Sequence, residues 1–176
     1  MSETHLLSDP YRALGTDMPF NQRLEHLYRV LREQLEGVDR FALARYNPDD
    51  QSLSAFMFES EAGTPFVDYC QPLDKVPSLQ QLAEQNTIRV VDDMREFRQE
   101  EFISAHSEAL LAVGLRASFT MPLRHQGELL GFLFLNSKRA GYFAPQMLAY
   151  CNVWGHLVGQ YVAQELLTAP DGSVAG

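Results

Sequence analysis

Two consecutive apolar strands in the C-terminal half most constrain the fold of this chain. Residues 115–123 and 128–137 each predict a strand, and His125-Gln126-Gly127 predicts a tight connection between them. Residues 129–135 are almost wholly apolar, which is typical of a central strand covered on both faces. The pair therefore predicts an antiparallel hairpin in the middle of a sheet that helices cover.

Shorter patterns place the other elements around this hairpin. Apolar residues at spacings of three and four predict helices over residues 20–36 and 145–167. The remaining segments predict strands over 40–46 and 53–59 with a turn between them, a loop over 60–77, a helix over 79–85, a strand over 87–91 and a helix over 96–113. This order indicates an α/β (α+β) fold in which a central antiparallel sheet carries the terminal helices on one face.

The length and charge of the chain limit its organisation and partners. With 176 residues, one domain is expected over 18–167, preceded by an N-terminal arm over 1–17 and followed by a tail or linker over 168–176. The net charge of −9, with no run of Lys or Arg, disfavours direct binding to nucleic acid or to anionic membranes.

The cysteines and the N-terminus indicate the compartment. Cys70 and Cys151 are too few and too far apart for a disulfide framework or a metal pattern. Neither a signal peptide nor a stretch of about 20 apolar residues is present. We therefore expect a cytoplasmic protein without a metal site.

The strand pair and its surroundings resemble the signature of GAF domains. That signature has a Gly-apolar-Arg-Ser start, a Pro-Leu strand end, a Gly turn, a Gly-apolar strand, a Ser, a Phe and a long final helix. The matching residues here are 114–123, Gly127, 130–137 and Phe143, and residues 89–93 look like the family's short third strand. The resemblance covers about residues 18–167.

The resemblance implies a GAF/PAS-like sheet with two different faces. The first and last helices cover one face and commonly form a dimer bundle, whereas middle helices and loops enclose a ligand pocket on the other. Such domains sense small molecules and pass the signal along the last helix, so a C-terminal output domain on a longer chain is expected. The function implied is a small-ligand-sensing, dimerising regulatory domain and not an enzyme.

Residue alternation then selects candidates for the pocket. Ser118 and Thr120 alternate with apolar neighbours along one strand, so both point to the same face. Two hydroxyls and an amide among aromatic rings suit a small polar and aromatic ligand, although the same groups could instead bond the neighbouring backbone. The full set of candidates is Ser118, Thr120, Phe132, Phe134, Asn136, Phe56, Phe58, Tyr69 and Asp92.

Two apolar stripes on the terminal helices are candidates for a homodimer interface. They consist of Leu24, Leu27 and Leu31 on the first helix and Cys151, Trp154, Val158 and Tyr161 on the last. The alternative is that these stripes pack on the chain's own sheet and leave it monomeric.

Two other functions are weighed against ligand sensing, and two ligand classes are weighed within it. A structural dimerisation domain without a ligand would have the same pattern. A reductase of free methionine sulfoxide uses this fold, but the catalytic cysteine is replaced here by Leu110-Leu111 and the pocket strand offers no carboxylate. A linked bilin is disfavoured because Gln71, not His, follows Cys70, and the cyclic-nucleotide pattern is incomplete. No cofactor is identified.

Overall fold

The computed structural model describes residues 2–60, 70–96 and 105–168, with backbone only for 56–60, 105–106 and 168. In this part of the chain a six-stranded sheet forms the centre, and each pair of neighbouring strands is antiparallel. The strands are β1 (Arg40–Asn47), β2 (Ser52–Ser60), β3 (Cys70–Pro72), β4 (Arg89–Val91), β5 (Ala117–His125) and β6 (Glu128–Ser137). The order across the sheet is β3-β2-β1-β6-β5-β4.

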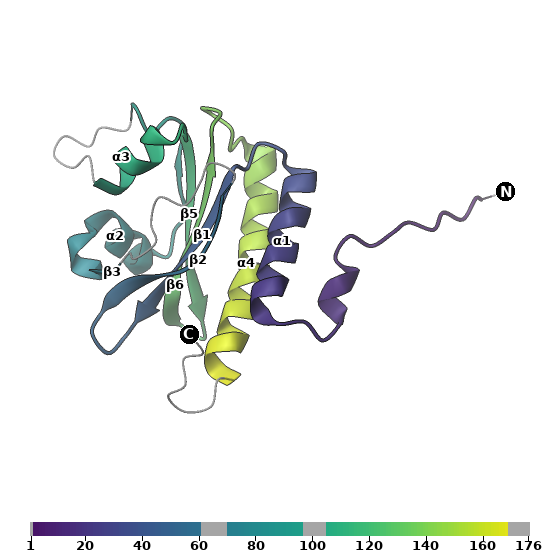
Figure 1. The fold of residues 1–176 in the computed structure, drawn as a ribbon, viewed down its shortest axis with the longest axis horizontal. Helices are drawn as coiled ribbons and strands as arrows, with labels where there is room; N and C mark the ends of the chain where they lie inside the picture. The colour runs from purple at the N-terminus through teal and green to yellow at the C-terminus, as the bar shows by residue number, and fades with distance from the viewer. Residues whose placement is uncertain (1, 61–69, 97–104, 169–176) are drawn as a thin grey trace.

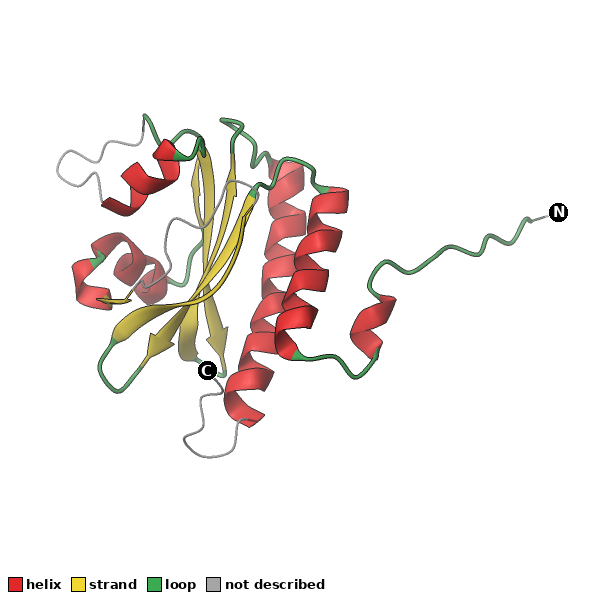
Figure 2. Ribbon diagram, viewed as in Figure 1, coloured by secondary structure: helices red, strands yellow, loops and turns green. Residues whose placement is uncertain are grey.

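The helices lie on the two faces of the sheet as the resemblance implies. Helices α1 (Phe20–Gln34) and α4 (Pro145–Thr168) run side by side on one face, and α2 (Pro77–Gln85) and α3 (Ala105–Ala112) lie on the other (Figure 1). Two short 3₁₀ helices, η1 (Arg12–Gly15) and η2 (Leu73–Lys75), complete the described elements. The layers of helix, sheet and helix are distinct in Figure 2, and the N-terminal arm extends away beside α1. This arrangement confirms the predicted fold class.

The larger core lies between the sheet and the α1/α4 pair. Leu24, Leu27 and Leu31 of α1 are completely buried there, because one apolar stripe of the helix faces the sheet. Trp154 of α4 joins the two helices: its indole Nε1 donates a hydrogen bond of 3.0 Å to the carbonyl oxygen of Leu27. The same ring packs edge-on against Phe41 of β1, with ring centroids 5.1 Å apart.

Gly131 allows β6 to lie close to β1. A Cβ atom at this position would lie 1.9 Å from the carbonyl oxygen of Ala44, which is far shorter than any real contact. The absence of a side chain therefore permits the pairing in which Gly131 lies opposite Arg45 of β1. The central place of β6 agrees with its apolar sequence, because a strand between two neighbours is covered on both faces.

The structure corrects two predictions about the middle of the chain. The predicted loop over 60–77 contains, in its described part, strand β3 and the 3₁₀ helix η2. The helix predicted over 96–113 is described only from Ala105 to Ala112, and Glu96 belongs to a turn in which its amide donates to the Asp93 carbonyl at 3.0 Å. Residues 97–104 lie outside the described part. No helix in the described ranges is long and apolar enough to cross a bilayer.

Candidate functional site

The side chains of strand β5 point alternately to two chemically different faces of the sheet. Phe119 and Met121 belong to the core under α1 and α4, so the alternating residues Ser118 and Thr120 face α2 and α3. We refer to this side as the α2/α3 face. Ser118 is 8% exposed and Thr120 is 0% exposed, so both predicted pocket hydroxyls are buried.

Cross-strand register arranges the side chains of this face in three rows. In the polar row, Ser118 lies opposite Asn136, which lies opposite Arg40. The middle row consists of Arg89, Thr120 and Phe134, and the apolar row contains Phe132 and Pro122. The face therefore changes from polar to apolar over the width of three residue pairs.

The polar row is held together by a buried arginine. Arg40 is 1% exposed, and its Nη1 atom donates a hydrogen bond of 2.8 Å to Oδ1 of Asn136. The Asn136 Nδ2 atom donates in turn to the Ala117 carbonyl oxygen at 3.4 Å. Burial lowers the pKa of the Arg40 guanidinium to about 10, because a low-dielectric surrounding disfavours the charged form.

The middle row contains two groups with unused hydrogen-bonding capacity. The Thr120 hydroxyl is completely buried and has no hydrogen-bond partner among the residues that the structure describes. The same holds for Nε of Arg89, and burial lowers the pKa of this guanidinium too. Buried polar atoms are normally paired, so these two groups are unusual for the interior of a protein.

The apolar row is continuous with a small second core. Phe132 is completely buried and packs with Leu53 of β2 and with Leu79, Leu82 and Ala83 of α2. Phe134 is partly buried against the same cluster, and its ring centroid lies 6.5 Å from that of Phe132. The aromatic residues predicted on β6 thus both pack in the cluster that α2 covers.

The other predicted ligand residues lie apart or outside the described side chains. Phe58 lies opposite Ala42 in the backbone register, while Phe56 occupies the irregular position between two pairs. The side chains of both are outside the description, as is the whole of Tyr69. Asp92 is exposed and does not join the three rows, whereas its neighbour Asp93 is 8% exposed.

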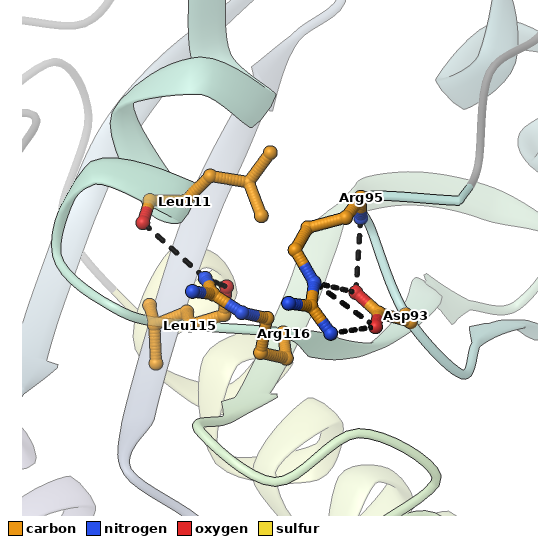
Figure 3. Close-up of polar contacts among 5 residues, drawn as sticks. All are labelled: Asp93, Arg95, Leu111, Leu115 and Arg116. Carbon is orange, nitrogen blue, oxygen red and sulfur yellow. Dashed lines mark hydrogen bonds and ion pairs between the residues drawn. The ribbon is translucent and has the colours of Figure 1, made fainter.

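Asp93 stabilises the turn at the α3 end of the site (Figure 3). Its carboxylate accepts hydrogen bonds from the amide, Nε and Nη2 of Arg95, the last at 2.6 Å. These bonds from Arg95 lower the pKa of Asp93, chiefly through the side chain. Arg116 secures the adjacent loop by donating Nη1 to the carbonyl oxygens of Leu115 at 3.1 Å and Leu111 at 3.4 Å. The Asp93 group is therefore structural in this arrangement.

The predicted dimer residues are packed within the single chain. Leu24, Leu27, Leu31, Cys151, Trp154 and Val158 are at most 2% exposed, and Tyr161 is half-buried with the Arg23 guanidinium 4.7 Å from its ring centroid. These side chains serve the core between the helices and the sheet. Contacts with a second copy would have to use the outer flanks of α1 and α4.

Sequence reasoning missed the two arginines of the α2/α3 face. Arginine is seldom buried, so Arg40 and Arg89 are absent from the predicted site residues. The signal that could have found them is alternation: Arg40 lies two residues before the inward-facing Ala42, and Arg89 precedes Val90, which packs on the opposite core. Together with Ser118, Thr120 and Asn136, they give the face donors suited to a ligand rich in oxygen acceptors.

The thiols and acids of the described residues do not form a reactive centre. Cys151 is buried, and burial raises the pKa of its thiol to about 12, whereas Cys70 is exposed on the edge strand β3. Within the described ranges no group of three or more His, Cys, Asp or Glu residues could hold a metal ion.

A separate cleft of about 440 Å³ lies between the N-terminal arm and α1. Its lining mixes Arg12 and Arg29 with Asp9 and Glu33, and all four are exposed. Exposed charges of both signs are well hydrated without a ligand, so this cleft offers less for recognition than the buried donors of the α2/α3 face.

Solved structures share this architecture at low sequence identity. A methyl-accepting chemotaxis protein (residues 122 to 287) matches with a TM-score of 0.67 at 14% identity, over 92% of this chain and 99% of that one. The type II free methionine-R-sulfoxide reductase from Thermoplasma acidophilum matches with 0.61 at 17%, over 82% and 93%. The chromophore-binding domain of a bacteriophytochrome from R. palustris matches with 0.60 at 14%, over 89% of this chain, which spans 58% of that domain's length.

At these identities the structural matches show the fold alone. A search of curated proteins finds no match. The sequence model of the GAF domain matches residues 20–161, which is well over half of the chain. The protein therefore belongs to the GAF domain family.

Proposed function

We propose that this chain is a sensory or regulatory domain that binds a small molecule on its α2/α3 face. Membership of the GAF family and the sensory proteins among its structural neighbours support the regulatory role. The proposal of a ligand depends on the Thr120 hydroxyl. This group is completely buried without a partner among the described residues, and Thr120 lies opposite Arg89. A bound molecule would satisfy these donors.

Native mass spectrometry of freshly purified protein, with an absorbance scan, tests the proposal. A discrete additional mass that disappears on denaturation supports a bound ligand, and a visible absorbance band would identify a chromophore. The Thr120→Val and Arg89→Gln variants should lose the mass, whereas Arg45→Gln, on the opposite face of the same sheet, should retain it. A chain that carries no added mass and is not stabilised by any small molecule would contradict ligand sensing and favour a purely structural domain.

We also propose that the domain forms a homodimer through the outer flanks of α1 and α4. Val153 of α4 is 72% exposed in the middle of the helix, which is unusual for a large apolar side chain. Val153→Glu should shift the protein to a monomer in sedimentation velocity, whereas Gln81→Glu, which adds the same charge at an exposed position of α2 on the other face of the sheet, should not. A wild-type monomer at all concentrations would refute the dimer. We further propose that an output domain follows α4 and that the protein is cytoplasmic.

Catalysis is the competing function, because one structural neighbour is a methionine sulfoxide reductase. A thiol reductase needs an accessible thiolate, and only Cys70 of the two cysteines is exposed. Reduction of free methionine-R-sulfoxide by the wild-type protein, lost in Cys70→Ser, would establish an enzyme. Our proposal expects no such activity.

A further inference from the structure

The N-terminal arm has a base that belongs to the folded domain. In this base, residues 8–17, the Tyr11 hydroxyl lies 2.5 Å from the Tyr150 hydroxyl of α4. On α1, Nη1 of Arg23 donates a hydrogen bond of 2.8 Å to the carbonyl oxygen of Leu14. The base is therefore attached to both terminal helices, and Figure 1 shows it on the side of α1 away from the sheet.

The tip of the arm, residues 2–7, leaves the domain beyond this attachment. It extends away from α1 (Figure 1). Leu6 is 94% exposed and Leu7 is 90% exposed, which makes them the two most exposed large apolar side chains in the described ranges. A single exposed leucine is ordinary, but two adjacent ones form a joint apolar surface in water. The tip therefore offers a short apolar segment to another molecule.

The cleft of about 440 Å³ beside the base has apolar residues in its lining. These are Pro10 and Ala13 of the base and Val30 of α1. Val30 is 2% exposed although it does not belong to the core between the terminal helices and the sheet, so the base of the arm covers it. Nε2 of His26 donates to the Pro10 carbonyl oxygen at 3.1 Å, which fixes the base against α1. The cleft is thus already formed within one chain.

The tip is badly placed to fill the cleft of its own chain. Leu7 directly precedes Ser8, which itself lines the cleft. A reversal of the chain takes a turn of four residues, so folding Leu7 back would displace the base that forms the cleft. An extended tip of this length spans about 20 Å, which is enough to reach a second molecule.

Charge favours a second copy of this chain as that molecule. Each copy carries a net charge of −9, so two copies repel each other except where the contact is balanced in charge. The tip contains one acid, Glu3, and the cleft lining contains two arginines and two acids: Arg12, Arg29, Asp9 and Glu33. Because tip and cleft adjoin in the chain, a two-fold axis beside α1 can bring each tip to the cleft of the other copy.

We propose that two copies of this chain exchange their tips, so that Leu6 and Leu7 of each copy pack beside Val30 in the cleft of the other. This inference rests on the proposed homodimer and specifies one contact within it, on the outer flank of α1. The exchanged tips add to the contact that Val153 makes through α4.

Sedimentation velocity over a range of concentrations tests the contribution of the leucines. Leu6→Ser/Leu7→Ser should raise the dissociation constant of the dimer at least about tenfold, because both tips lose their apolar side chains. Ile88→Ser, which removes an exposed apolar side chain next to β4, should leave the dissociation constant unchanged. In the monomeric Val153→Glu variant, the double substitution should leave the unfolding midpoint unchanged, because both leucines are exposed within a single chain.

Disulfide trapping locates the tip directly. Leu7→Cys and Ala13→Cys are made separately in a Cys70→Ser background, in which the remaining cysteine, Cys151, is buried. When the two variants are mixed and oxidised with copper phenanthroline, mass spectrometry should detect a disulfide that joins one copy of each. Leu7→Cys mixed with Gln81→Cys, at an exposed position of α2 on the other face of the sheet, should not form this link.

The outcomes separate this inference from the homodimer on which it rests. A wild-type dimer that the double substitution does not weaken, with no cross-link between positions 7 and 13, would overturn tip exchange and leave the homodimer intact. A chain carrying both new cysteines that forms only an intrachain disulfide would place the tip in its own cleft and would also overturn the exchange. A wild-type monomer at all concentrations would refute both.

Discussion

The hydroxyl of Thr120 offers a prediction whose sign depends on whether the site is empty. In the structure this hydroxyl is 0% exposed and has no partner among the described residues. A buried hydroxyl without a hydrogen bond costs about 1–3 kcal/mol relative to its hydrated state. Thr120→Val replaces the hydroxyl with a methyl group of nearly the same size, so it should remove this cost and stabilise the ligand-free domain.

The expected gain is measurable. For a chain of this length, 1 kcal/mol corresponds to about 2–4 °C in the unfolding midpoint, so Thr120→Val should raise the midpoint of the ligand-free protein by roughly 2–12 °C. Urea denaturation gives the free energy of unfolding at constant temperature, after native mass spectrometry has confirmed that no ligand remains. With a ligand bound, the sign should reverse, because the variant can no longer donate to it.

Ser137 provides the control of opposite sign. It is also 0% exposed, but its Oγ atom accepts a hydrogen bond of 3.1 Å from the Arg139 amide. Ser137→Ala should therefore destabilise the domain by about 0.5–1.5 kcal/mol. If Thr120→Val destabilises the verified ligand-free protein as Ser137→Ala does, the Thr120 hydroxyl has a partner in the empty site, and the argument for a missing ligand donor is refuted.

Three further predictions test packing, thiol chemistry and acid stability. Gly131→Ala should destabilise the domain by about 3 kcal/mol or more in urea denaturation, because its Cβ would overlap a backbone carbonyl of β1. Gly15→Ala, which has open space around it, should be nearly neutral. Equal effects of the two substitutions would contradict the close approach of β6 to β1. A colorimetric thiol reagent at pH 8 should modify Cys70 rapidly and Cys151 only after unfolding, since burial raises the pKa of Cys151 to about 12; two fast thiols would refute this. Hydrogen bonds from Arg95 lower the pKa of Asp93. The carboxylate therefore stabilises the fold at pH values above its usual pKa of about 3.9, and this stability is lost as the pH falls through the lower pKa of the folded protein. Unfolding of Asp93→Asn should accordingly depend less on pH below about 4 than that of the wild type, and parallel profiles would argue against the assignment.

The sheet and its terminal helices could be predicted from the sequence because their patterns are long. Strand β6 has nearly continuous apolar character, and α1 and α4 each repeat apolar residues over several turns. Strand β3 was missed because it comprises only Cys70–Pro72, is exposed throughout and pairs on one side with β2. Three exposed residues at the edge of a sheet carry no periodic signal, so only the pairing itself defines them.

The sequence predicts which hydroxyl, amide and aromatic residues of β5 and β6 share one face of the sheet, but not the charged residues on that face. Alternation along β5 and β6 correctly selected Ser118, Thr120 and Asn136 as residues of one face, and the structure buries all three. Burial of Arg40 depends on the register with Asn136, a residue 96 positions later, which no local pattern contains. The stripe on α1 and α4 was ambiguous for a related reason: an apolar stripe indicates that something covers it, but not whether the cover is the chain's own sheet or a second copy.

The position of β5 gives a physical basis for linking a ligand to the terminal helices. Thr120 faces the proposed ligand, while its immediate neighbours Phe119 and Met121 face α4 and the segment before it. Phe119 packs on Phe143 with ring centroids 5.9 Å apart, and Met121 lies so close to Gly155 that a Cβ there would be 2.7 Å from its sulfur atom. Because interiors are close-packed, a displacement of β5 by a ligand cannot be absorbed at this contact and must move either α4 or the methionine side chain. A tight contact on one side of the strand and unsatisfied donors on the other are what a domain needs if occupancy of its site is to change the arrangement of its helices.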